Sequence, residues 1–223
     1  LKRFFDTYCV ARNASVAIVG DIDRKAAEAL VTRLLKKVPV GKEPGPIPEV
    51  DELQKARVIR VAHPSTQTHI LMGHPGNYRG DPDYFPMYIG NHALGGSGLV
   101  SRLSDEVREK RGLSYSVSSY FLPLARKGVF QVSMQTRNDQ AEQGLKVLRQ
   151  TLQEYVDKGM TAKELQASRK NITGGFPLRI DSNKKILGYL TVICFYKLPL
   201  TYLDDFNRNI DYVTFNQIQE TMC

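Results

Sequence analysis

Apolar and polar residues repeat with two different periods along this chain, and the two periods predict separate helices and strands. Apolar residues recur at i, i+3, i+4 and i+7 over residues 24–38 and again over 139–156, which is typical of amphipathic helices. Segments 113–122 and 128–136 alternate between apolar and polar residues instead, so they predict an antiparallel hairpin. Three further segments have the length and composition of strands: 15–20, 57–62 and 67–74.

Residues that favour helix N-termini predict four more helices, at 81–94, 161–174, 182–196 and 214–223. Asp23 is placed to cap the helix that begins at residue 24, and Thr161 and Glu164 have the spacing of a capping box. Pro86 fits the helix over 81–94 only if it falls in the first turn. The order of the elements predicts an α+β fold, with a mainly antiparallel sheet covered on one face by helices.

One stretch in the middle of the chain combines a glycine-rich turn, a short helix and the start of a strand. Gly95-Gly96-Ser97-Gly98 precedes a helical pattern over residues 100–111, Gly112 ends it, and an alternating strand begins at Leu113. Three apolar residues at helical spacing are expected to form one stripe: Val100, Leu103 and Val107. Arg108 lies in the last helical turn, where a cation favours the helix dipole. Tyr115 is expected on the following strand.

This stretch resembles the second domain of the M16 zinc metallopeptidases, the pitrilysin and mitochondrial-processing-peptidase type. In that family a pattern of the form GG…SRL…lRe…G.sY ends in an Arg and a Tyr that reach the active chamber, and Arg108 and Tyr115 match those positions. The segment from Ser15 to Asp23 is similar to the family's "ivGDid" pattern, and His74-Pro75-Gly76 to its "H-PG" segment. The resemblance covers most of residues 1–200 and implies paired domains that enclose a chamber.

The resemblance implies that Arg108 and Tyr115 contact a peptide held at the zinc ion of another domain. A guanidinium can hold a peptide carbonyl, and a phenol can donate a hydrogen bond to the oxyanion that develops when water attacks. From the residues alone, an Arg in a last helical turn most often caps carbonyls, and a strand Tyr most often packs. Catalytic support by Arg108 and Tyr115 is therefore conditional on a zinc-bearing domain.

The chain lacks the H-x-x-E-H helix with which an autonomous M16 peptidase binds zinc. Its four histidines are His63, His69, His74 and His92, and none stands in that pattern. His69 and His74 are five residues apart, so a regular strand would direct them to opposite faces. The sequence thus predicts no metal site in this chain, which alone is predicted inactive, and zinc is expected in a partner domain or subunit.

Composition and motifs argue against several other classes of function. The net charge is +8, from 31 Lys and Arg against 23 Asp and Glu, but the basic residues are scattered without aromatic interleaving, which favours a solvated surface over nucleic-acid binding. No apolar run is long enough to span a bilayer. The sequence has no G-x-S-x-G or Walker A motif. Cys9, Cys194 and Cys223 are far apart and are expected to be free thiols.

Three functions of different classes remain from the sequence. The first is the C-terminal substrate-binding domain of an M16-type zinc metallopeptidase, which would bind peptide or unfolded polypeptide. Its expected partner is an N-terminal M16 domain of the same polypeptide or a zinc-bearing subunit, in a two-domain or dimeric assembly. The second is a non-catalytic M16-like subunit, and the third is a basic nucleic-acid-binding domain, which rests on the pI of about 9.4 alone.

The expected domain organisation follows from the first of these functions. Residues 1–14 are expected to be a linker from a missing N-terminal domain, and residues 15–223 a single M16-like C-terminal domain with a truncated last helix. Leu1 is not a methionine, so an N-terminal portion is expected upstream. The sequence does not choose between the bacterial periplasm and the cytoplasm.

Overall fold

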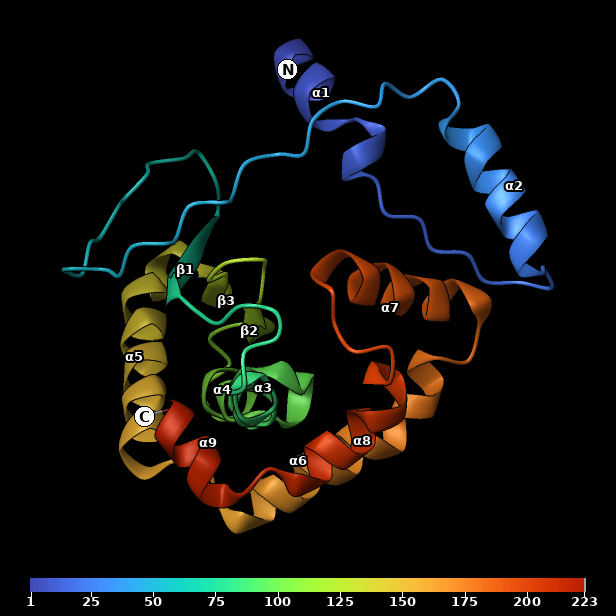
Figure 1. The fold of residues 1–223 in the computed structure, drawn as a ribbon. Coiled ribbons are helices and arrows are strands. Elements are labelled where there is room, and N and C mark those ends of the chain that lie inside the picture. Colours follow the sequence, from blue (N-terminus) through green and yellow to red (C-terminus); the bar gives the residue numbers. More distant parts are fainter. Residues whose placement is uncertain (223) are drawn as a thin grey trace. The chain divides into compact units, whose positions relative to one another are not determined.

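The computed structural model describes residues 1–222, and Figure 1 shows the course of the chain. The chain divides into two compact units. Unit 1 comprises Leu1–Pro48 and Gly175–Phe206, and unit 2 comprises Glu49–Gly174 and the residues from Asn207 onward. The helices of the described residues are α1 Lys2–Tyr8, α2 Arg24–Leu35, α3 Tyr84–Asn91, α4 Arg102–Ser104, α5 Ala141–Lys158, α6 Ala162–Gly175, α7 Asn183–Tyr196, α8 Tyr202–Tyr212 and α9 Phe215–Met222. None of these helices is long and apolar enough to cross a membrane.

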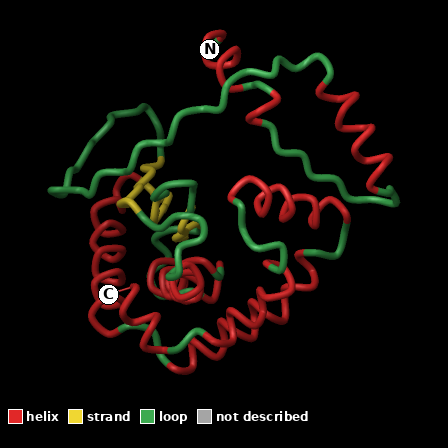
Figure 2. The backbone as a smooth tube through the Cα atoms, in the orientation of Figure 1, coloured by secondary structure: helices red, strands yellow, loops and turns green. Residues whose placement is uncertain are grey.

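A three-stranded antiparallel sheet is the centre of unit 2 (Figure 2). Its strands are β1 Gln67–Pro75, β2 Ser116–Leu122 and β3 Val129–Arg137, in the order β1-β3-β2. Val132 of β3 lies opposite Met72 on one side and opposite Ser119 on the other. The predicted hairpin and the predicted strand over 67–74 are therefore confirmed.

Alternation along β3 gives the sheet one buried face. Phe130, Val132, Met134 and Thr136 are buried, and the residues between them are only half-buried. Helices α3 and α4 pack against β2, and α5 packs against β1 and β3. The predicted α+β fold, with an antiparallel sheet and helices on one face, is confirmed.

Two of the predicted strands, residues 15–20 and 57–62, are extended but unpaired. In the part of the chain that the structure describes, the backbone groups of residues 15–19 and 57–62 have no hydrogen-bond partner. A strand needs a neighbouring strand to satisfy its backbone, and neither segment pairs with β1, β2 or β3. Segment 57–62 does carry one exposed side-chain ion pair, between Arg60 and Glu142 at 3.3 Å.

The predicted helix starts are confirmed more closely than the predicted helix lengths. The Asp23 carboxylate accepts the Ala26 N–H at 2.7 Å at the start of α2. In the capping box before α6, the Thr161 N–H donates to Glu164 at 2.6 Å and the Glu164 N–H donates to Thr161 Oγ1 at 3.2 Å. Pro86 lies in the first turn of α3, as required. That helix gives way to a π-helical turn, His92–Gly96, which includes the first two glycines of the glycine-rich segment.

Unit 1 has its own small apolar clusters. Val10 is buried against Gly41, whose φ of +65° and close approach leave no room for a Cβ atom. The N–H of Ala11 donates to the carbonyl of Pro39 at 2.8 Å, which holds these two segments together. Elsewhere in the unit, the rings of Phe176 and Phe206 stack with centroids 4.5 Å apart.

Candidate functional site

The helical segment that carries Arg108 is anchored by a serine cap and two buried side chains. Ser101 Oγ donates to the carbonyl of Gly98 at 2.7 Å and accepts the N–H of Ser104 at 3.4 Å. Leu103 and Val107 are completely buried, whereas Val100 is 81% exposed. The predicted stripe of three residues is therefore wrong at Val100, because the cap at Ser101 leaves that residue outside the helix.

The helical segment forms a π-helical turn at Arg108 and ends at Gly112. After α4 the chain forms a π-helical turn, Asp105–Glu109, a geometry that is frequent at functional sites. Gly112 adopts a φ of +60°, and its N–H donates to the carbonyl of Arg108 at 2.9 Å. The N–H of Leu113 donates to the carbonyl of Val107 at the same distance. The turn thus fixes the backbone between Arg108 and the next strand.

We expect Gly112→Ala to destabilise the protein by about 1 kcal/mol, because a Cβ atom is disfavoured at positive φ. No neighbouring atom lies within 4 Å of the added Cβ, so the effect would come from the backbone alone. Urea unfolding measures it. Gly45→Ala is the control, since Gly45 has equal space without a positive φ. Equal midpoints for the two variants would contradict the expectation.

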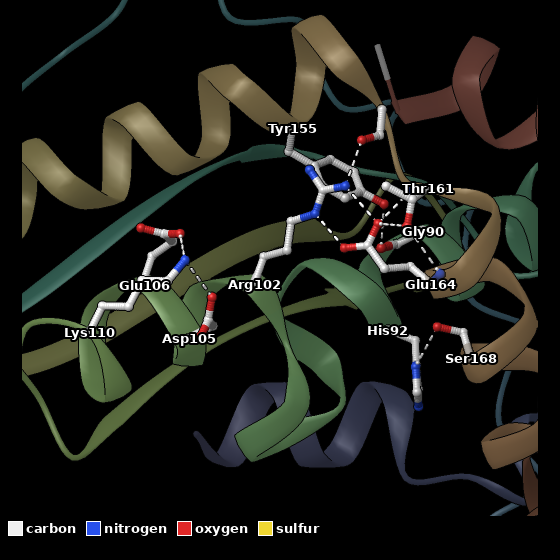
Figure 3. Close-up of polar contacts among 11 residues, drawn as sticks. Gly90, His92, Arg102, Asp105, Glu106, Lys110, Tyr155, Thr161, Glu164 and Ser168 are labelled. Carbon is white, nitrogen blue, oxygen red and sulfur yellow. Dashed lines mark hydrogen bonds and ion pairs between the residues drawn. The ribbon is translucent and has the colours of Figure 1, made fainter.

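Arg108 has a looser ion pair than the cations that follow it. Its Nε lies 3.4 Å from the Glu109 carboxylate, and its side chain is 34% exposed. Lys110 Nζ, in contrast, lies 2.6 Å from Glu106 and 2.8 Å from Asp105 (Figure 3). The hydrogen bond from Lys110 lowers the pKa of Glu106. The ion pair of Arg108 is therefore longer than those of Lys110, although the Arg108 side chain is the less exposed, at 34% against 53%.

The Tyr115 side chain projects into solvent, although hydrogen bonds hold the backbone on both sides of it. The side chain is 91% exposed. Ser114 Oγ accepts the N–H of Ser116 at 3.1 Å and donates to the carbonyl of Gln135 at 2.6 Å. Thr136 Oγ1 donates to the carbonyl of Leu113 at 2.5 Å. Tyr115 comes one residue before β2 rather than on it, which explains why its side chain is not packed into the sheet.

A partly buried ion pair, which the sequence did not predict, connects this segment to α6. Arg102 donates from Nε and Nη2 to the two Glu164 oxygens at 2.5 and 2.6 Å, and from Nη2 to the carbonyl of Gly159 at 2.8 Å (Figure 3). Its guanidinium lies 4.8 Å from the ring centroid of Tyr155, whose hydroxyl donates to the carbonyl of Gly90 at 2.8 Å. This cluster ties α4 to α5 and α6.

The electrostatics of Glu164 follow from the same contacts. Burial raises the pKa of the carboxyl, but the hydrogen bonds from Arg102 and Thr161 outweigh burial and lower the pKa to about 2. The hydrogen bond to Glu164 raises the pKa of Arg102. The capping box identified Glu164 as a helix cap, but its ionic partner lies 62 residues earlier, beyond any local pattern.

The histidines lie in separate environments. His74 contacts the Phe130 ring at 5.2 Å, and His69, five residues earlier on β1, points to the opposite face, as the spacing predicts. His92 Nδ1 lies 2.9 Å from Ser168 Oγ and its Nε2 lies 3.1 Å from Asn171 Oδ1, so this ring joins α6 to the end of α3 (Figure 3). Across residues 1–222, no three His, Cys, Asp or Glu side chains are grouped to hold a metal ion.

The fold is an α+β domain in which helices cover one face of an antiparallel sheet. Residues 1–172 match the family model described as the peptidase M16 inactive domain, and the chain therefore belongs to the peptidase M16 family. The chain is 30% identical over 193 residues to the uncharacterized zinc protease SCO5738 of Streptomyces coelicolor, covering 84% of this chain and 42% of the relative.

Solved structures support the same assignment. A peptidase M16 inactive domain from Pseudomonas fluorescens is 38% identical and superposes with a TM-score of 0.91, over 99% of this chain and 52% of the solved chain. A protease from Helicobacter pylori, at 20% identity, shares the fold with a TM-score of 0.87, over 99% of this chain and 54% of that one. The chain spans about half the length of these proteins, or less.

Proposed function

We propose that this chain is the substrate-binding C-terminal domain of a zinc metallopeptidase, and that Arg108 and Tyr115 contact a peptide at a zinc site carried by another domain or subunit. The observation that carries the proposal is the 91% exposure of Tyr115 on a pinned backbone, beyond the helical turn that presents Arg108. A side chain this exposed packs little against the rest of the chain and can reach a bound peptide. The zinc protease name of the Streptomyces relative supports the same class of activity.

The chemistry of the two side chains suits different atoms of a peptide. The Arg108 guanidinium can hold a substrate carbonyl through two parallel N–H donors. The Tyr115 phenol can donate a hydrogen bond to the oxyanion that forms when water attacks the scissile carbonyl. Zinc in the companion domain would activate that water and polarise the carbonyl. The chain itself contributes binding and charge stabilisation.

The first prediction concerns Tyr115 and is measured on the chain combined with a zinc-bearing M16 domain. We expect Tyr115→Phe to lower kcat for cleavage of a labelled unfolded polypeptide about 10-fold with little change in KM, because the lost hydrogen bond forms mainly in the transition state. Tyr212→Phe is the control, since Tyr212 is also exposed, at 74%, but lies on α8. Unchanged cleavage by Tyr115→Phe would overturn the role of Tyr115.

A non-catalytic subunit is the second candidate function. It is favoured by a relative named the non-peptidase homolog YmxG of Helicobacter pylori, which is 27% identical over 129 residues. This function requires the fold and its partner surface but no hydrogen bond from Tyr115. The Tyr115→Phe measurement therefore separates the two candidates, and an absence of cleavage in any combination with a zinc-bearing domain would favour the subunit.

A further inference from the structure

The Tyr115 side chain lies on the face opposite to the one that strand alternation predicts. Along β2, Val117 and Ser119 are both buried. Because successive side chains of a strand alternate between its two faces, a regular extension of β2 would bury residue 115 with them. Tyr115 is exposed instead, and Ser114 is only 5% exposed. The alternation is therefore reversed just before β2 begins.

The Ser114 hydroxyl accounts for this reversal. Ser116 and Gln135 are register partners at the end of the β2–β3 ladder. Ser114 Oγ accepts the N–H of Ser116 at 3.1 Å and donates to the carbonyl of Gln135 at 2.6 Å, so the hydroxyl stands between the two partners. The carbonyl of Ser116, at 2.8 Å, is a second acceptor for the same proton. Because the Ser114 side chain turns toward β3, the next side chain, Tyr115, turns outward.

A second buried hydroxyl holds the residue before Ser114. Thr136 is 2% exposed, and its Oγ1 donates to the carbonyl of Leu113 at 2.5 Å. The N–H of Leu113 donates to the carbonyl of Val107, in the helical turn that carries Arg108. Residues 112–115 lie between that turn and β2, outside both, so side-chain hydroxyls supply hydrogen bonds that the ladder does not. We call Ser114 and Thr136 the hydroxyl pair.

We propose that Ser114 is a positioning residue for Tyr115, assisted by Thr136, and that the hydroxyl pair fixes the direction in which the phenol reaches a bound peptide. A side chain as exposed as Tyr115 packs little, so its placement depends on its backbone. A misplacement of about 1 Å can lower a rate by as much as about 100-fold. The proposal rests on the proposed function, because the position of the phenol affects cleavage only if Tyr115 contacts the substrate.

The test removes one hydroxyl at a time from the chain combined with a zinc-bearing M16 domain. We expect Ser114→Ala to lower kcat about 5-fold with little change in KM, which is less than the loss from removing the phenol hydroxyl itself. Thr136→Val, which keeps the shape of the side chain, is expected to act in the same direction. Ser119→Ala is the matched control, since Ser119 is also buried on β2 but donates to Asn91 Oδ1, at 2.6 Å. It should destabilise the fold without lowering kcat.

A double-mutant cycle and a measurement of backbone motion distinguish positioning from stability. If Ser114 acts through Tyr115, adding Ser114→Ala to Tyr115→Phe should change kcat by less than about 2-fold. In the chain alone, the NMR order parameter of the Tyr115 N–H should fall from about 0.85 to below about 0.6 in Ser114→Ala. The Ser119→Ala control should leave that order parameter unchanged, because its hydrogen bond lies on the other side of the strand start.

Two results would overturn the proposal. The first is a wild-type kcat in both Ser114→Ala and Thr136→Val while Tyr115→Phe is impaired, which leaves the proposed function intact. The second is an equal loss from Ser114→Ala with and without the Tyr115 hydroxyl, which would assign Ser114 another route. The proposed function fails separately, through cleavage that is insensitive to Tyr115→Phe. The Tyr115 order parameter then decides alone: a fall in Ser114→Ala supports the hold on this backbone, and an unchanged value refutes it.

Discussion

Arg108→Ala is expected to lower kcat/KM for peptide cleavage, in combination with a zinc-bearing domain, about 100- to 1,000-fold. That is the range for removing one preorganised donor from a transition state. The loss should exceed that of Tyr115→Phe, because hydrogen bonds from a charged donor are about twice as strong as neutral ones. The structure supplies the reason for choosing Arg108 among its neighbours, since its ion pair to Glu109 is loose at 3.4 Å.

Two further variants separate charge, geometry and stability at this position. Arg108→Lys keeps the charge but cannot form a bidentate hydrogen bond, so we expect it to retain only part of the wild-type activity. Arg111→Ala is the matched control, because the Arg111 guanidinium is bound to Glu106 at 2.5 Å. Steady-state kinetics with equal zinc loading is the measurement. Equal losses from Arg108→Ala and Arg111→Ala would indicate a general effect of surface charge and would refute a specific contact by Arg108.

Local patterns were sufficient to predict the elements whose partners lie nearby. The hairpin of β2 and β3 alternates along its whole length, and the side chain of Asp23 meets the N–H it caps within three residues. Such signals depend only on the side-chain period and on capping chemistry. They predicted the α+β class and the sheet with helices on one face.

Features that depend on distant partners could not be predicted in this way. Residues 15–20 have the composition of a strand, but pairing requires a neighbour that local composition does not reveal. The Arg102–Glu164 pair joins residues 62 positions apart. Val100 was misassigned because the helix begins at Arg102, after the Ser101 cap, and not at residue 100.

The candidate site could be predicted from local patterns only in part. Periodicity placed Arg108 at the end of a helix and Tyr115 near the start of a strand, but it could not distinguish a packed tyrosine from an exposed one. Only the resemblance to M16 peptidases selected these two residues. The structure adds the exposure of Tyr115 and the turn at Gly112. It also adds the ion pair of Arg102, which supports the helical segment from the side of α6.

That ion pair leads to the largest expected effect on stability. Glu164 has a pKa of about 2 in the folded protein, below the usual value of 4.5. A lowered carboxyl pKa contributes stability that is complete above about pH 4.5 and is lost as the pH falls toward 2. With the side chain 28% exposed, the contribution is up to about 3 kcal/mol at pH 7.

Glu164→Gln should therefore lower the free energy of unfolding by about 2 to 3 kcal/mol at pH 7, because it leaves the half-buried Arg102 guanidinium without its counter-charge. The loss should shrink below pH 4.5, because the stability that the ionised Glu164 carboxylate gives the wild-type protein decreases there. Urea unfolding between pH 2.5 and 7, in steps of about half a unit, measures both effects. Glu142→Gln is the control, since its ion pair to Arg60 is 79% exposed on both sides and should contribute less than about 1 kcal/mol. A Glu164→Gln loss that stays constant across this pH range would show that Glu164 acts only as the α6 cap, and that Arg102 is held by Tyr155 and Gly159 without it.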